Sequence, residues 1–198
     1  MANSKRFRQL QFRIKDITKH LLPKTKLSGN YTKEEQDKIR GYLLLIHAEI
    51  ESFFEERVEE KVNTAFIKWQ SKRQKSNILL SVMAFRNDEI SYTPFKNNKS
   101  IEARIEKAKN SFTHFIRVQN HGIKEDNLLN LLLPIGIEEN QMDNTWLSTM
   151  ESFGKSRGQV AHSTAKTQNP LDPVTEQATI NLIMSEIEKI DLLISKLN

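Results

Sequence analysis

Arg157 and His162 are the two residues whose types and spacing best suit catalysis in this sequence. An imidazole titrates near neutral pH and can accept or give a proton, whereas a guanidinium stays charged. Cleavage of RNA by its own 2′-hydroxyl needs a proton removed from the nucleophile, a proton given to the leaving 5′ oxygen, and positive charge beside the phosphorane. Histidine suits the first two roles and arginine the third. Because RNA supplies the nucleophile, this chemistry requires no metal.

The spacing of the pair places a condition on the structure around it. Helical residues five positions apart point about 140° away from each other, so both side chains reach one phosphate only at a helix end or across an interface. His162 precedes Ser163-Thr164 and the break at Asn169-Pro170, so we expect it near the last turn of its helix. Gly154 and Gly158 should let another backbone come close.

Other chemistries have little support in the sequence. The absence of cysteine excludes disulfides, thiolate nucleophiles and Cys-ligated zinc or iron–sulfur sites. No Gly-rich phosphate loop, HExxH, GxSxG, EF-hand or kinase signature occurs. None of the five histidines has a spacing to a carboxylate or a second histidine that strongly indicates a metal site. We therefore expect neither a metal nor a cofactor.

The net charge of +5 is distributed in alternating blocks. Residues 1–26 and 65–117 are basic, with eight basic against one acidic and eleven against four, and residues 27–64 and 118–198 are acidic. Basic patches of this size hold a phosphate backbone without sequence specificity, although charge scattered for solubility is an equal alternative. The expected RNA surfaces are the N-terminal Lys/Arg cluster and a strip formed by Lys68, Lys72, Arg73 and Lys75.

The composition predicts an all-α fold. A chain of 198 residues with 37% hydrophobic residues, 6 Gly and 5 Pro suits long amphipathic helices in one domain, residues 1–198. We expect a basic N-terminal helix and loop in residues 1–30 and a core bundle in 31–198. Periodicity and caps predict helices over about 5–22, 32–64 or beyond, 66–83, 100–116, 125–133, 144–162 and 172–197. Ser100 and Asp172 are expected to cap the helices that they begin. The last helix carries an apolar seam that must be buried, either in the core or against a second copy of the chain: Ile183, Ile187, Ile190, Ile194 and Leu197. Residues 86–99 are expected to be an irregular loop with at most a short extended piece.

The second predicted helix carries two polar residues on its apolar side. Thr32 and Glu35 have the spacing of a capping box and mark its start. His47 and Glu51 lie one turn apart within the apolar stripe, where an ionised carboxylate needs a partner if it is buried. A Glu–His pair, or a Glu paired with a structural arginine, would explain them without any catalytic role.

No segment of the sequence predicts a membrane protein. The basic N-terminus lacks a continuous apolar stretch of the signal-peptide kind, and no apolar run approaches the roughly 20 residues that span a bilayer. A cytoplasmic location is therefore the expectation.

Three stretches of the chain resemble a known family. They are the run LLLIHAEIESFF at 43–54, the segments NHGIK at 120–124 and LLPIGI at 132–137, and the run SFGKSRGQVAHS at 152–163. Together they resemble the HEPN superfamily, and within it the RiboL-PSP-HEPN branch. The family's Arg-x4-6-His motif falls on Arg157 and His162, and its acidic residue of the second helix falls on Glu51.

The resemblance implies an antiparallel helical bundle that forms a homodimer, in which two Arg/His pairs line one cleft. It further implies a metal-independent endoribonuclease that leaves a cyclic phosphate and acts as a toxin, in phage defence or in RNA processing, with an antitoxin or neighbouring defence protein as a possible partner. Glu51 would orient Arg157 or His162, and Lys155, Ser156 and Ser163 would contact the phosphate. Many HEPN nucleases have a polar residue directly after the arginine, whereas this chain has a glycine.

Two other interpretations remain at this stage. Arg157, His162 and Glu51 would form a buried polar network in a non-catalytic helical module that dimerises or binds another enzyme. DNA binding through the basic face is less favoured, because no helix-turn-helix with a Gly-containing tight turn is evident.

Overall fold

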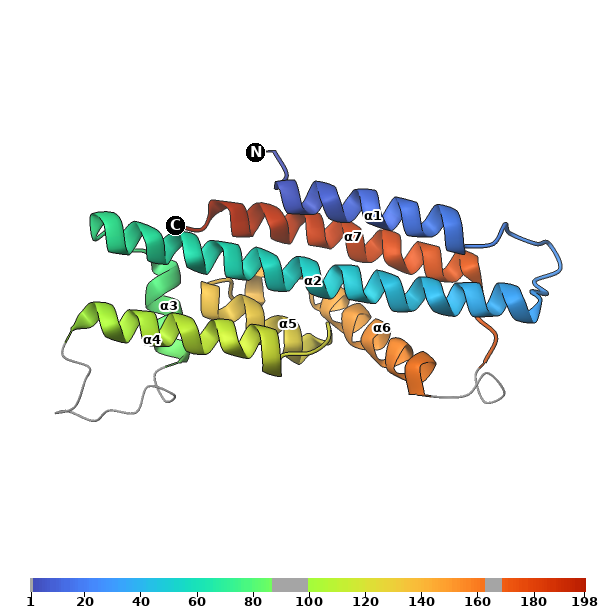
Figure 1. Cartoon of the computed structure of the whole chain (residues 1–198). Coiled ribbons are helices and arrows are strands. Elements are labelled where there is room, and N and C mark those ends of the chain that lie inside the picture. The colour runs from blue at the N-terminus through green and yellow to red at the C-terminus, as the bar shows by residue number, and fades with distance from the viewer. Residues whose placement is uncertain (1, 87–99, 163–168) are drawn as a thin grey trace. The chain divides into compact units, whose positions relative to one another are not determined.

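The computed structural model describes residues 2–86, 100–162 and 169–198, although the side chain of His162 lies outside this description. These residues form seven α-helices and no strand, which confirms the all-α prediction (Figure 1). The helices are α1 (Lys5–Leu21), α2 (Lys33–Lys72), α3 (Asn77–Phe85), α4 (Ile101–His114), α5 (Glu125–Leu132), α6 (Asn144–His162) and α7 (Pro173–Lys196). A π-helical turn, η1 (Phe115–Gln119), and two 3-10 turns, η2 (Leu133–Ile135) and η3 (Glu139–Gln141), complete the elements. The extended piece predicted within 86–99 falls outside the described residues.

The helix starts are set by the side chains that the sequence identifies. The Thr32 backbone N–H donates to Glu35 Oε2 at 2.7 Å, and the Glu35 N–H donates to Thr32 Oγ1 at 3.3 Å, as a capping box requires. Asp172 caps α7 by accepting the N–H of Thr175 at 3.0 Å, and Ser100 caps α4 in the same way. Each cap satisfies a backbone donor that a helix start leaves unpaired.

The end of α2 differs from the prediction. Helical signals continue from Phe66 to Met83, whereas α2 ends at Lys72 and a new helix begins after Ser76. Arg73 has a φ of 51°, in the left-handed region, and the N–H of Gln74 reaches back to the carbonyl of Lys68 at 3.4 Å. This pattern closes a helix, and it is hard to foresee because glycine usually occupies the left-handed position.

The described chain forms two compact units. The first unit comprises residues 1–53, 122–125 and 142–192. In it, α1 packs against the first half of α2, with the rings of Phe7 and Phe53 edge to face at 6.1 Å. Ser4 at the start of α1 donates its N–H to Asp191 of α7 at 2.8 Å. The basic N-terminal helix is thus a packed element of this unit.

The seam of isoleucines on α7 is buried, as the sequence predicts. Ile183, Ile187 and Ile190 are fully inaccessible to solvent in the first unit. Leu171, two residues before the start of α7, is also held in place, because its backbone and the Gln36 side chain exchange two hydrogen bonds of 2.8 Å. Burial of the seam within the chain selects the core over a second copy as its cover.

The second unit comprises residues 54–121, 126–141 and 193–198. Three contacts join the second half of α2 to α4 and η1, and they recur every seven or eight residues. Glu59 accepts from Arg117 Nε at 3.1 Å, the Lys109 Nζ lies 5.2 Å from the Phe66 ring centroid, and Arg73 Nη2 donates to Glu102 at 2.7 Å. The two helices therefore run antiparallel, with one stabilising contact about every two turns.

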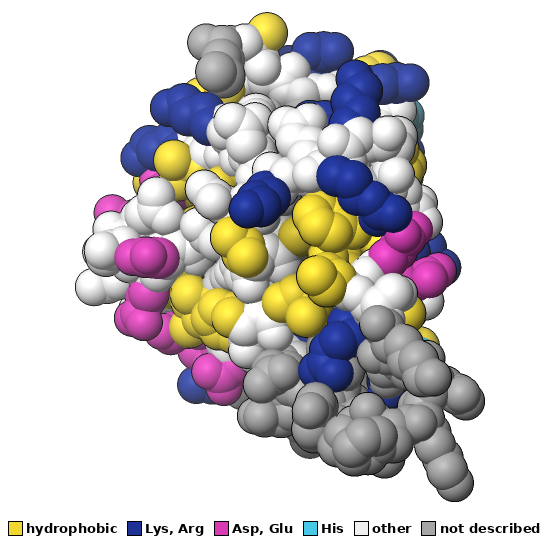
Figure 2. Space-filling view, turned by 90° about the vertical axis from the view of Figure 1, so that its left-hand side faces the viewer, with side chains coloured by type: hydrophobic (Ala, Val, Ile, Leu, Met, Phe, Trp, Pro, Cys, Tyr) yellow, Lys and Arg dark blue, Asp and Glu magenta, His cyan; other side chains and the backbone are white. Residues whose placement is uncertain are grey.

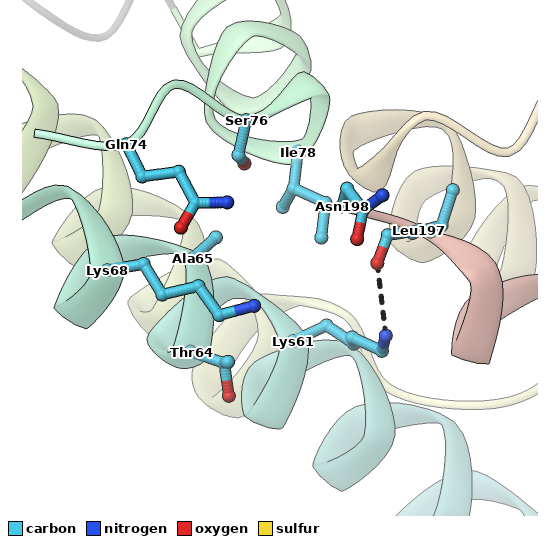
Figure 3. A pocket seen from close by; sticks show the side chains of 9 residues that line it. All are labelled: Lys61, Thr64, Ala65, Lys68, Gln74, Ser76, Ile78, Leu197 and Asn198. Carbon is cyan, nitrogen blue, oxygen red and sulfur yellow. Dashed lines mark hydrogen bonds between the residues drawn. The ribbon is translucent and has the colours of Figure 1, made fainter. Parts of the chain in front are cut away.

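The end of α7 is held in the second unit by Lys61 (Figure 3). The Lys61 Nζ donates to the carbonyls of Ser195 and Leu197 at 3.1 and 3.2 Å. The backbone N–H groups of Asn77 and Ile78 donate to the carbonyl of Asn198. The cavity beside these residues measures about 30 Å³, which holds a water molecule and no larger ligand.

Across the described residues, no helix combines the length and apolar content needed to cross a bilayer. The prediction of a single domain stays a prediction, since the two units are each compact in themselves.

Candidate active site

Arg157 lies on α6, five residues before the end of that helix at His162. Its side chain is half-buried, and its Nε atom is inaccessible to solvent and makes no hydrogen bond in the described part of the chain. No carboxylate of the described residues forms an ion pair with its guanidinium. The positive charge of Arg157 is thus free of a counter-ion within that part of the chain.

His47 of α2 is affected by the charge of Arg157. Its side chain is only 2% exposed, and its ring faces that of Phe153 at a centroid distance of 6.1 Å. Burial and the charge of Arg157 lower the pKa of His47 from 6.5 to about 4. The imidazole is therefore neutral at pH 7, because both effects oppose a second positive charge.

Glu51 lies one turn after His47 and bonds to a backbone group. One carboxylate oxygen accepts the N–H of Gly122, and the other lies 3.5 Å from Nδ1 of His47. Gly122 has a φ of 111°, a conformation that L side chains rarely adopt, so a glycine suits this position. Glu51 thus holds the backbone at Gly122 in place beside α2, and its described contacts do not include Arg157.

The other residues predicted at the site take different positions. Lys155 is exposed and pairs with Glu151 through a 3.1 Å contact. Ser156 is half-buried and lines a groove described below. Ser163 and the side chain of His162 lie outside the described residues. The structure thus brings Glu51, His47 and Arg157 into one unit, with His162 at the end of the same helix as Arg157.

The two glycines of α6 differ in their surroundings. A Cβ atom added at Gly154 would lie 2.7 Å from Cγ of Lys124 and 3.6 Å from its backbone nitrogen, so another backbone does approach there. At Gly158 an added Cβ would meet nothing within 4 Å. The predicted close approach is therefore confirmed at Gly154, and the face beside Gly158 is open.

The basic strip expected to contact RNA lies in the second unit. All four side chains are exposed, but Arg73 is paired with Glu102 and lies over the Trp69 ring at 5.7 Å. Lys68, Lys72 and Lys75 are the positive charges of this strip that remain for a ligand, and their contact with RNA stays a prediction.

His47 is the site residue to which the sequence assigned no chemical role. The available signal was its place in the apolar stripe, one turn before Glu51. Its neutral state could not be read from the sequence, because it depends on the charge of Arg157, which lies 110 positions further along the chain.

These observations define an all-α protein with an uncompensated guanidinium beside a buried neutral histidine and an anchored glutamate. The RiboL-PSP-HEPN family model matches residues 8–196. The chain therefore belongs to the RiboL-PSP-HEPN family of helical HEPN proteins. Comparisons with curated proteins and with solved structures give no match.

Proposed function

We propose that the protein is a metal-independent endoribonuclease that cuts RNA by attack of the 2′-hydroxyl, at a composite active site of a homodimer. The observation that carries the proposal is that Arg157 is half-buried and has no carboxylate partner among the described residues. A partly buried charge costs free energy unless it is paired, and a guanidinium that only held helices together would be expected to have a carboxylate partner. Arg157 lacks one among the described residues, which suits a group that receives a phosphate from outside.

In this proposal Arg157 stabilises the negative charge of the phosphorane, and His162 acts as the general base or acid. Glu51 acts indirectly. It fixes the Gly122 backbone and lies against His47, the neutral residue next to Arg157, and so it is a positioning residue. Lys155, Ser156 and Ser163 are proposed to contact the phosphate, with Lys155 exchanging its partner Glu151 for the ligand.

The dimer is what the family resemblance implies, and the spacing of the pair is compatible with it. Because Arg157 and His162 point about 140° apart on a regular helix, the His162 of one copy would complete the site with the Arg157 of the other. The open face at Gly158 suits such an approach, since no described atom fills the space where its side chain would be.

The test is cleavage of a mixed RNA pool by the purified protein in EDTA. We expect cyclic-phosphate ends from the parent, and loss of cutting by at least about 100-fold in Arg157→Ala and in His162→Ala. Arg117→Ala is the matched control, because it removes a guanidinium that is already paired with Glu59. Light scattering would check that all variants remain folded dimers.

Undiminished cutting by Arg157→Ala would disprove the proposed role of that residue. If the parent cuts no RNA, the remaining interpretation is the non-catalytic module that binds another protein.

We further propose a role as a toxin or in phage defence, with an antitoxin or neighbouring defence protein as partner. Arrest of cell growth by the parent, and growth with Arg157→Ala, is the expected result.

A further inference from the structure

A groove of about 420 Å³ lies between α6 and α7 in the first unit. Its volume is in the range of small-molecule sites. The α6 wall consists of hydroxyl side chains and the ring of Phe153, and the α7 wall consists of Glu176 and Thr179. The proposed function assigns nothing to this groove except Ser156.

The groove adjoins the candidate active site. Ser156, which lines the groove, directly precedes Arg157 on α6. Phe153 also lines the groove, and its ring lies 6.1 Å from that of His47. Ser156 and Arg157 project about 100° apart on α6, so Arg157 lies beside the groove and is not part of its wall.

Two hydroxyls of the α6 wall present hydrogen-bond acceptors to the groove. The hydroxyl of Thr149 donates to the carbonyl of Thr145 at 2.8 Å, and that of Ser152 donates to the carbonyl of Ser148 at 2.9 Å. Because each hydroxyl hydrogen is used within α6, the lone pairs of the two oxygens are what remains for a ligand. A ligand that contacts these two oxygens must bring its own donors.

Glu176 supplies the strongest acceptor of the groove. No described residue donates a hydrogen bond to its carboxyl group, and burial together with the charge of Asp172 raises its pKa. A group that donates two hydrogen bonds to the Glu176 carboxylate would oppose both the burial and the repulsion by Asp172, because these bonds stabilise the ionised carboxylate. Among the RNA bases, guanine carries two adjacent N–H donors, at N1 and N2, on the edge that single-stranded RNA exposes for recognition.

We propose that this groove binds a guanine base adjacent to the scissile phosphate, and that the Glu176 carboxylate selects it by accepting from N1–H and N2–H. The inference rests on the proposed ribonuclease function. It adds a substrate preference, which the Arg157 and His162 chemistry does not specify because that chemistry involves only phosphate and ribose.

The first test is equilibrium binding of the four 3′-nucleoside monophosphates to the full chain. We expect 3′-GMP to bind about tenfold more tightly than the AMP, CMP and UMP counterparts. Glu176→Gln should remove this preference, because an amide replaces one acceptor by a donor. Glu188→Gln is the matched control. That carboxylate lies further along α7, outside the groove, and accepts from Asn3. Equal binding of all four nucleotides by the parent would overturn the inference.

The second test maps the ends of RNA fragments. Cleavage beside guanine by the parent, and cleavage without base preference by Glu176→Gln, is the expected result. If the parent cuts RNA at all bases equally, the guanine site is wrong and the ribonuclease proposal stands. If 3′-GMP binds through Glu176 but no RNA is cut, the guanine site stands and the ribonuclease proposal fails. Retention of the guanine preference by Glu176→Gln would refute the role of that residue.

Discussion

The Nδ1 atom of His47 lies 3.5 Å from Oε2 of Glu51, and yet the two side chains do not form an ion pair at neutral pH. Burial of the imidazole and the charge of Arg157 lower the pKa of His47 to about 4, so the ring is uncharged. The nearby carboxylate does not offset these two effects. Glu51 is held instead by the backbone N–H of Gly122. The chemistry of the site thus depends on Arg157 as its one fixed positive charge among these three side chains.

Stability should fall in mild acid through His47. The folded-state pKa of about 4 lies below the unfolded value of 6.5, so the unfolded chain binds more protons between these pH values. The contribution is complete above pH 6.5 and is lost as the pH falls toward 4. We expect a loss of about 2 kcal/mol between pH 7 and pH 5 in urea unfolding, and a smaller loss in His47→Asn. His20→Asn, at an exposed position, should behave as the parent; equal pH profiles for all three proteins would refute this account.

Removal of the Arg157 charge should raise the pKa of His47. In Arg157→Ala the effect of burial remains, so we expect the pKa to move from about 4 partway toward 6.5. An NMR titration of the His47 ring signals measures this change. Lys155→Ala removes a charge two residues away that is paired with Glu151, and it should leave the titration unchanged. A constant pKa in Arg157→Ala would show that the guanidinium does not act on the imidazole.

The Glu51 carboxylate should contribute to stability as a hydrogen-bond acceptor. Glu51→Ala leaves the N–H of Gly122 without its partner, which should lower the free energy of unfolding by about 1–3 kcal/mol. Glu51→Gln keeps an acceptor oxygen and should cost less. Urea unfolding at pH 7 would measure both. If Gln costs as much as Ala, the negative charge and not the hydrogen bond is what the fold requires.

The two glycines of α6 should respond differently to alanine. Gly158→Ala adds a methyl group in open space and raises helix propensity, so we expect a gain of about 0.5–1 kcal/mol in unfolding free energy. Gly154→Ala must displace the Lys124 side chain, and this contact offsets the same gain in propensity. Thermal unfolding compares the pair at one helix. A larger gain at Gly154 than at Gly158 would contradict the packing described.

Much of the fold follows from signals that act over a few residues. The capping box at Thr32 and Glu35, the cap at Asp172 and the isoleucine seam of α7 are local patterns, and each forms as predicted. The end of α2 could not be predicted from such local patterns, because Arg73 adopts a left-handed conformation that favours glycine. That break is supported by tertiary contacts, including the ion pair of Arg73 with Glu102, which lies 29 residues away.

The site was predictable in its residue types and less so in its contacts. Spacing and resemblance singled out Arg157, His162 and Glu51. The partner of Glu51 is the backbone N–H of Gly122. A backbone group cannot be identified from the pattern of side chains in the sequence. The lowered pKa of His47 likewise arises from burial and from a charge distant in sequence. Both features depend on how the helices of the first unit pack.

The three contacts between α2 and the α4–η1 segment carry a further consequence for how the second unit folds. From the view of Figure 2, which faces the side where α3 and the start of α4 lie in Figure 1, Lys and Arg side chains are numerous on the surface. A helix displaced by two turns would change which charges meet. A shift in one direction would bring Lys109 against Arg73, while Arg117 reached the Phe66 ring. A shift in the other would bring Glu102 against the negative face of that ring, while Lys109 reached Glu59. Each displaced alignment would thus have one favourable and one unfavourable contact in place of the three favourable contacts of the native one. The order of charges along these helices therefore disfavours misaligned pairings, in addition to stabilising the native one.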